Sequence, residues 1–202
     1  MKKILASAIL VFYMSQCFAQ TGKSGRLTPE EFVIMPWSWP PGDSSTFKDV
    51  YDCGFNLAGF VKAEDLKSAS KSGLKAIVYD NSADVRSTVS ANGESLSEGE
   101  ITKRVNEIAR KTANDKAVFS YLLMDEPGTE YFPALKAWKD AFAKAIPNSL
   151  TYINLYPNYA NNETQLKAKS YEDYLEKYVS MVKPVSYTHL RAHETKANLV
   201  CR

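Results

Sequence analysis

The amino-acid sequence predicts an α/β protein built from repeated strand–helix units. Short apolar runs alternate with amphipathic stretches whose apolar residues recur at helical spacing. The units follow one another at intervals of roughly 30 residues, which is the spacing of a βαβ unit. The apolar runs are continuous, which indicates strands buried on both faces, as in a parallel sheet that is covered by helices.

Five strands and five helices are expected in alternation. The expected strands cover residues 32–35, 55–61, 74–79, 118–124 and 150–155. The expected helices cover residues 46–53, 63–72, 99–114, 132–146 and 171–182. Pro36 ends the first strand, and glycines end the first two helices. The longest predicted loop covers residues 81–98. Trp138 lies on the apolar stripe of its helix, which predicts a core position.

Two architectures fit this alternation, an open doubly wound sheet and a (β/α)₈ barrel. Residues 35–42 carry tryptophans and prolines where a dinucleotide-binding fold needs a glycine-rich turn. Polar and aromatic residues follow nearly every strand, as they do in a barrel whose site uses all the C-terminal strand ends. We therefore expect a truncated (β/α)₈ TIM barrel that contains about five of the eight βα units.

The N-terminal residues predict a secretory signal peptide. Residues 1–19 combine two lysines, an apolar run and small residues at Cys17 and Ala19. The protein is therefore expected to be secreted or periplasmic. Residues 20–30 are expected to form an N-terminal lead-in, and residues 31–183 are expected to form the N-terminal part of a TIM-barrel catalytic domain.

The C-terminal residues are expected to have a different origin from the rest of the chain. Residues 185–202 resemble the translation of a transposase sequencing adapter, so residues 184–202 are expected to be a non-native tail. His189 and His193 are the only histidines of the chain, and both lie in this tail. The rest of the chain then has no histidine for Ser-His-Asp catalysis or for zinc, and carboxylates are the candidates for acid–base chemistry.

Composition argues against several functional classes. Lys and Arg total 25 and Asp and Glu total 23, so the net charge of +2 predicts no nucleic-acid partner. The N-terminal apolar run is too short to span a membrane. No lysine or arginine falls at the predicted strand ends, which disfavours a phosphate-bearing ligand, and no cofactor or metal is expected. Cys53 is the only cysteine between the two end segments, and a buried thiol is expected there.

Candidate functional residues gather at the C-terminal ends of the predicted strands, which meet at one mouth of a parallel barrel. Flat aromatic faces suit sugar rings, and Asn and Asp can hydrogen-bond sugar hydroxyl groups. The residues in chain order are Trp37, Trp39, Asp80, Asp125, Glu126, Asn154 and Tyr156. Together they predict a carbohydrate substrate.

The segment Tyr121-Leu-Leu-Met-Asp-Glu-Pro127 resembles the strand-four signature of the (β/α)₈ retaining glycoside hydrolases, a clan that includes cellulases and β-galactosidases. More loosely, residues 32–183 are similar to secreted glycoside-hydrolase-like proteins of Bacteroidetes. The resemblance implies hydrolysis of O-glycosyl bonds with Glu126 as the acid/base. Asp125 departs from the family, which has an Asn that touches the sugar 2-hydroxyl. The family's nucleophile is a Glu on strand seven, which would lie beyond Lys183, so the fragment is expected to be inactive.

Other interpretations stay open. Asp125 can simply cap the helix that follows it, with Pro127 in the first turn. Trp37 and Trp39 can anchor a loop, and Asp80 can cap a turn. At the level of function, the alternatives are a non-catalytic glycan-binding TIM-barrel protein and a metal-assisted hydrolase that uses Asp80 and Asp125.

Overall fold

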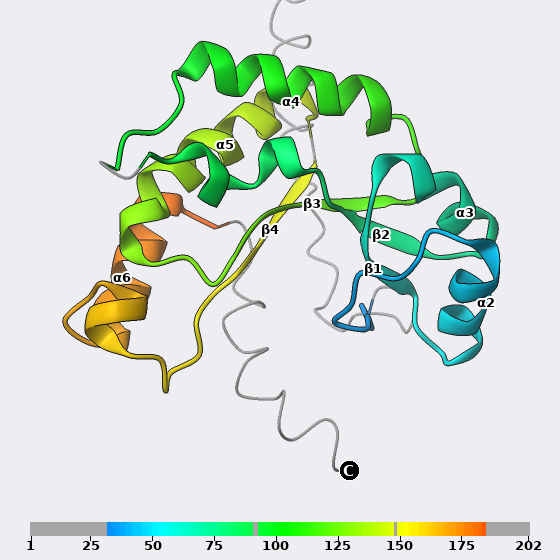
Figure 1. The fold of residues 1–202 in the computed structure, drawn as a ribbon, viewed down its shortest axis with the longest axis horizontal. Helices are drawn as coiled ribbons and strands as arrows, with labels where there is room; N and C mark the ends of the chain where they lie inside the picture. Colours follow the sequence, from blue (N-terminus) through cyan, green and yellow to red (C-terminus); the bar gives the residue numbers. More distant parts are fainter. Residues whose placement is uncertain (1–31, 91–92, 148, 185–202) are drawn as a thin grey trace, which may run out of the picture. The chain divides into compact units, whose positions relative to one another are not determined.

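The structure is a computed structural model that describes residues 32–90, 93–147 and 149–184. The described residues from Ile34 onward belong to one compact unit. Its centre is a four-stranded parallel sheet in the order β1-β2-β3-β4 (Figure 1). The strands are β1 Leu57–Val61, β2 Lys75–Val78, β3 Val118–Asp125 and β4 Leu150–Asn154.

Helices alternate with the strands, and this confirms the predicted α/β class. They are α2 Ser44–Asp52, α3 Leu66–Lys71, α4 Glu98–Thr112, α5 Phe132–Ala145 and α6 Tyr171–Val182. Short turns of other helix types are η1 Ala63–Asp65, η2 Asn81–Ala83, η3 Val85–Thr88, η4 Thr129–Tyr131 and η5 Asn162–Leu166. None of the described helices is long and apolar enough to cross a membrane.

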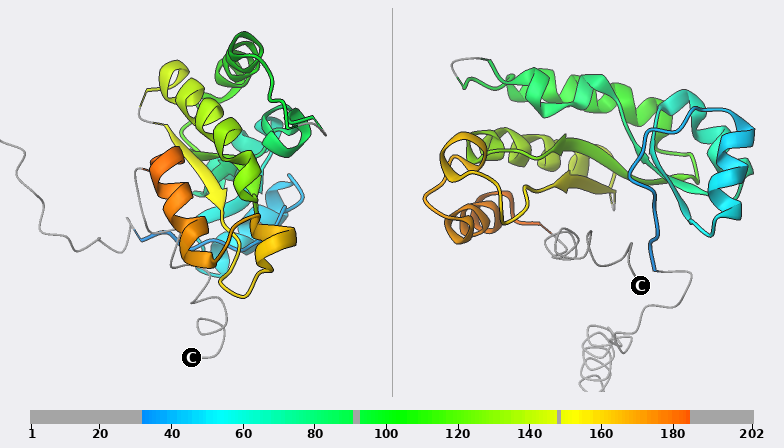
Figure 2. Two further views of the ribbon diagram at one scale, coloured as in Figure 1. Left: turned by 90° about the vertical axis from the view of Figure 1, so that its left-hand side faces the viewer. Right: turned by 60° about the horizontal axis from the view of Figure 1, so that its bottom comes forward.

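The five helices cover one face of the sheet, as Figure 2 shows from two sides. Apolar side chains from alternate strand positions, such as Val78 and Leu123, form a large core with residues of these helices. Trp138 of α5 is fully buried there, as predicted. Tyr121 of β3 stacks on Phe142 of α5, with 4.7 Å between ring centroids.

The opposite face of the sheet carries a smaller aromatic core. Leu57, Phe60, Ile77 and Leu122 form its buried centre, and no helix contributes to it among the described residues. The rings of Trp37 and Trp39 lie against Phe60, at centroid distances of 4.9 and 4.5 Å. A parallel sheet needs apolar cover on both faces, and on this face the described cover comes from the irregular segment before α2.

The predicted strand at residues 32–35 is wrong, so the described part of the chain forms a sheet of four strands and not five. At Ile34 the chain contacts the start of β1 without continuing the ladder. The Ile34 carbonyl accepts from the N–H groups of Asn56 and Leu57 at 3.1 and 3.2 Å, but the Ile34 N–H donates to the Asn56 side chain at 2.8 Å. A side chain thus replaces a backbone partner, and Pro36, which has no N–H, cannot extend the pairing.

The irregular segment then crosses close over β1. Ser38 donates its N–H to the Pro36 carbonyl at 3.0 Å, and its own carbonyl accepts from the Phe60 N–H at 3.0 Å. Gly59 lies under this crossing with φ +93°, and a Cβ on it would lie 2.5 Å from the Ser38 oxygen. Only glycine allows both the positive φ and the close approach.

Two further expectations change. Residues 81–98 were expected as a loop, but they contain η2 and η3 and the start of α4. Cys53, expected to be buried, is exposed at the end of α2. The predicted signal peptide, the lead-in of residues 20–30 and residues 185–202 of the predicted tail lie outside the described residues.

Candidate functional site

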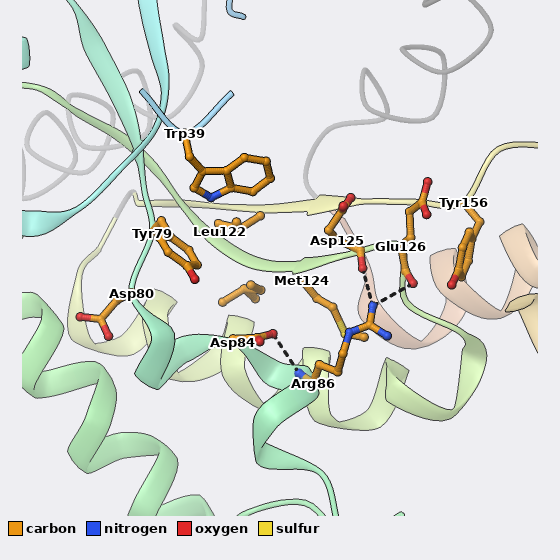
Figure 3. A pocket seen from close by; sticks show the side chains of 11 residues that line it. Trp39, Tyr79, Asp80, Asp84, Arg86, Leu122, Met124, Asp125, Glu126 and Tyr156 are labelled. Atoms are coloured by element: carbon orange, nitrogen blue, oxygen red, sulfur yellow. Dashed lines mark hydrogen bonds between the residues drawn. The ribbon is translucent and has the colours of Figure 1, made fainter. Parts of the chain in front are cut away.

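A cavity of about 310 Å³ opens at the C-terminal ends of β2 and β3 (Figure 3). Its lining includes five of the seven residues that the sequence predicted: Trp39, Asp80, Asp125, Glu126 and Tyr156. The other lining residues are Tyr79, Asp84, Arg86, Leu122, Leu123 and Met124. Trp37 and Asn154 lie outside the lining.

Trp39 forms an aromatic wall of the cavity. Its ring is tilted by 31° against Phe60 at 4.5 Å and is nearly perpendicular to Tyr79 at 6.5 Å. The side chain remains 49% exposed, so these contacts hold the ring and still leave a surface open. Trp37 packs edge-on against the same Phe60 ring at 4.9 Å and lies 6.4 Å from Tyr152. Trp37 therefore packs as a loop anchor beside the cavity.

Asp125 and Asn154 are coupled across the last pair of strands. They are register partners in β3 and β4. The Asn154 side-chain amide donates to Asp125 Oδ1 at 2.6 Å, and the Asn154 carbonyl accepts the Glu126 N–H at 2.7 Å. Asn154 thus orients the Asp125 carboxyl group and supports the next residue, although it does not itself line the cavity.

Glu126 directly follows β3 and has a left-handed backbone, with φ +49°. A positive φ is uncommon for a residue with a side chain and costs free energy, so an observed example directs attention to function. The Glu126 side chain is half-buried and lines the cavity. Figure 3 shows the Asp125 and Glu126 carboxyl groups on the side of the turn that carries the Trp39 ring.

The structure does not bear out Asp125 as a helix cap. Asp125 is the last residue of β3, and α5 begins at Phe132, where Tyr131 is the capping residue and makes no side-chain cap. The proline in the first turn of α5 is Pro133, not Pro127. The carboxyl groups of Asp125 and Glu126 therefore do not cap α5.

Asp80 does cap a turn, as one of the sequence interpretations allowed. Its Oδ1 accepts from the N–H and the hydroxyl group of Ser82 at 2.9 and 2.6 Å at the start of η2. Asp84 does the same at the start of η3, where it accepts from the Arg86 N–H at 3.2 Å. Both carboxyl groups line the cavity, but each is already tied to its own turn.

Arg86 is a site residue that its local sequence does not predict, because no lysine or arginine falls at the predicted strand ends. Its Nη2 donates to the Asp125 carbonyl at 2.7 Å and to the Glu126 carbonyl at 3.4 Å. Arg86 lies in the long polar segment after β2, and nothing in its local pattern signals where the side chain ends. Only the folding of η3 brings it to the cavity.

Tyr156 lines the cavity beside Glu126 (Figure 3). Burial raises the pKa of the Tyr156 phenol, the negative charges of Glu126, Glu130 and Asp125 raise it further, and the Arg86 charge partly opposes them. The phenol therefore stays protonated at neutral pH and can donate a hydrogen bond. The backbone carbonyl of Tyr156 accepts a hydrogen bond from the Tyr171 hydroxyl group at 3.2 Å.

The metal-assisted interpretation finds no support in the arrangement of donors. Within residues 32–90, 93–147 and 149–184, no three His, Cys, Asp or Glu side chains come close enough together to hold an ion. Asp80 and Asp125, which that interpretation uses, line the cavity together with Asp84 and Glu126, but no three of these carboxyl groups lie close enough together to share an ion.

Comparison with known proteins finds likeness in structure but not in sequence. No protein-family model matches the chain, and no curated protein matches it. Endoglucanase Cel5A from Pseudomonas stutzeri is 17% identical with a TM-score of 0.46, over 57% of this chain and 43% of that one. GH5_18 from Streptomyces cattleya, solved with GlcNAc, is 13% identical with a TM-score of 0.44, over 61% and 44%. A variant of GH5_18 with Manβ1-4GlcNAc is 11% identical with a TM-score of 0.48, over 68% and 48%.

These likenesses cover part of the chain and concern its fold. The chain spans less than half the length of the solved structures named above.

Proposed function

We propose that the chain supplies the acid/base carboxyl group and an aromatic sugar platform to a retaining glycoside hydrolase, which cleaves O-glycosyl bonds in poly- or oligosaccharides. One observation carries the proposal: Glu126 lies at the C-terminal end of a parallel strand and lines an open cavity that also has the exposed ring of Trp39 in its wall. Catalytic groups of parallel α/β barrels stand at such strand ends. A predicted signal peptide at residues 1–19 makes the protein secreted or periplasmic in this proposal.

The chemistry needs two carboxyl groups about 5–5.5 Å apart across the scissile bond. The second carboxylate attacks the anomeric carbon while Glu126 protonates the leaving oxygen, which gives a covalent glycosyl-enzyme. Glu126 then removes a proton from the water that attacks the same carbon and releases the second carboxylate. We propose that the second carboxylate, the nucleophile, stands on a later strand, as in the glycoside hydrolases that the Tyr121–Pro127 segment resembles. Asp80 is not proposed as the nucleophile, because its Oδ1 accepts two hydrogen bonds from Ser82 in the η2 turn.

The test compares two glutamate variants in the complete reading frame that contains this chain. Glu126→Gln removes the proposed proton donor, and Glu130→Gln removes an exposed carboxylate four residues further on, outside the cavity lining. A general acid contributes about 10²- to 10⁴-fold, so Glu126→Gln should lower kcat on an unactivated disaccharide by that factor. A dinitrophenyl glycoside needs little protonation to leave, and its hydrolysis should fall far less.

Equal loss on both substrates, or equal loss in the Glu130→Gln variant, would contradict the role of Glu126. Glycan binding without hydrolysis, unchanged by Glu126→Gln, would favour a non-catalytic glycan-binding protein instead. The exposed ring of Trp39 would serve both functions, so Trp39→Ala should weaken oligosaccharide binding in either case.

A further inference from the structure

Side chains from distant segments hold three successive backbone carbonyls where β3 ends, those of Asp125, Glu126 and Pro127. Arg86 Nη2 contacts the Asp125 carbonyl at 2.7 Å and the Glu126 carbonyl at 3.4 Å. The Tyr174 hydroxyl group donates to the Pro127 carbonyl at 2.8 Å from the buried side of α6. The Glu126 N–H donates to the Asn154 carbonyl of β4 at 2.7 Å. The turn is thus fixed by η3, β4 and α6 together.

Such support has a physical reason in the backbone of Glu126. Its φ of +49° is unfavourable for a residue with a side chain, and such a conformation persists only where the surroundings impose it. Hydrogen bonds from a guanidinium group to carbonyl oxygens are charge-assisted and stronger than those between neutral groups. Arg86 therefore supplies the strongest of the side-chain contacts that hold this conformation.

The guanidinium group of Arg86 is itself held in place. Its carbon lies 5.7 Å from the ring centroid of Tyr131 in η4, which is a cation–π contact. The backbone N–H of Arg86 donates to the Asp84 carboxyl group at the start of η3. In Figure 3 the Arg86 side chain reaches the two carbonyl oxygens from one side of the turn, while the carboxyl groups of Asp125 and Glu126 lie on the other.

We propose that Arg86 is a positioning residue, which holds the left-handed turn so that the Glu126 carboxyl group stays in the cavity. Its catalytic consequence rests on the proposed function, but its effect on the turn does not. The guanidinium group acts through backbone oxygens and needs no contact with the substrate.

The direct readout is amide hydrogen exchange at Glu126 in the 202-residue chain. Arg86→Met keeps the length of the stem and removes both hydrogen bonds, and it should speed exchange of the Glu126 N–H by about tenfold or more. The Ala76 N–H, which donates to the Ala117 carbonyl at 2.7 Å, should exchange as in the parent chain. Arg86→Lys keeps one cation without the planar fork and should produce a smaller acceleration.

Arg104→Met is the matched control. Arg104 donates Nη1 to the Ser82 carbonyl at 3.2 Å, so this variant removes an Arg–carbonyl contact of the same kind away from the β3 turn. Exchange at Glu126 should not change in it. The proposal is overturned if Arg86→Met leaves exchange at Glu126 unchanged or speeds Glu126 and Ala76 alike. If Arg86→Met does not fold, unchanged exchange at Glu126 in Arg86→Lys overturns it.

The catalytic readout separates this inference from the proposed function. In the complete reading frame, Arg86→Met should lower kcat by roughly 10- to 100-fold with little change in KM, because a misplaced catalytic group slows the chemical step. Arg86→Lys should restore part of kcat. A parent enzyme without glycosidase activity would refute the proposed function, and the exchange experiment would still decide the role of Arg86. A changed KM with unchanged kcat would refute positioning and leave the proposed function intact.

Discussion

At the scale of single residues, the site depends on a glutamate in an unfavourable conformation. Glu126 has a positive φ, which glycine or asparagine would adopt with less strain. A chain that keeps a strained glutamate gives up stability, which is typical of positions retained for activity. The Asn154–Asp125 hydrogen bond and the Arg86 contacts offset part of that cost.

A residue that tolerates a positive φ better should make the protein more stable when it stands at position 126. Glu126→Asn and Glu126→Gln both remove the charge beside Asp125, but asparagine tolerates the left-handed region better than glutamine does. We expect the Asn variant to be more stable than the Gln variant by about 0.5–1 kcal/mol. Urea unfolding of the two variants measures the difference. A Gln variant as stable as the Asn variant would show that the backbone carries no such strain.

At the scale of elements, one irregular segment links the sheet to the cavity. Residues 36–39 cross over β1, where Gly59 lets the Ser38 carbonyl approach the strand. That crossing positions Trp39 over Phe60 and in the wall of the cavity. The register of β1 against β2 shifts between Leu57 and Phe60, as expected where a glycine interrupts a regular ladder.

Gly59→Ala should therefore disturb both stability and the site. The added Cβ would meet the Ser38 oxygen at 2.5 Å, at a φ of +93°, so we expect a loss of about 2 kcal/mol or more. Movement of residues 36–39 should also change the fluorescence of Trp39 and weaken the glycan binding that we propose for its ring.

Gly99→Ala provides the matched comparison. Gly99 lies in the first turn of α4, and a Cβ there would meet nothing within 4 Å. The same chemical change should raise stability by about 0.5–1 kcal/mol, because alanine favours the helix. Equal effects of the two substitutions, measured by thermal unfolding, would contradict the close approach at Gly59.

At the scale of the whole molecule, burial of aromatic side chains on both faces of the sheet makes stability sensitive to alkaline pH. Tyr152 lies on the face opposite the helices, and burial, with the charge of Asp125, raises its pKa to about 12. Burial raises the pKa of Tyr178 of α6 to about 12 and also raises the pKa of Tyr174. These phenols stay neutral in the folded chain at a pH where the unfolded chain ionises them.

The sign of the pH dependence follows directly. Between pH 10 and pH 12 the unfolded chain releases protons that the folded chain keeps, so the free energy of unfolding falls as pH rises through this window. Tyr152→Phe and Tyr178→Phe should each make this fall less steep. Tyr159→Phe is the control, because Tyr159 is 85% exposed, and it should leave the slope unchanged. Urea unfolding at several pH values checks the prediction.

Much of the fold and part of the site could be predicted from the sequence. The α5 stripe around Trp138 and the continuous apolar run of β3 are local patterns, and each reflects the spacing at which side chains meet a core. Parallel strands then bring their C-terminal ends to one edge, which is why Asp80, Asp125 and Glu126 were expected together and do line one cavity.

The sequence by itself thus determined the α/β class, the order of the helices and of four of the five predicted strands, and the carboxyl and aromatic residues at the strand ends, because periodicity and strand polarity are local properties. Tertiary structure alone decided that the Ile34 N–H pairs with the Asn56 side chain, and that Arg86 reaches the carbonyls of Asp125 and Glu126. It also decided the positive φ of Glu126. The reason is that these features depend on hydrogen bonds between residues far apart in the chain, and no local pattern records which distant partner a backbone group will find.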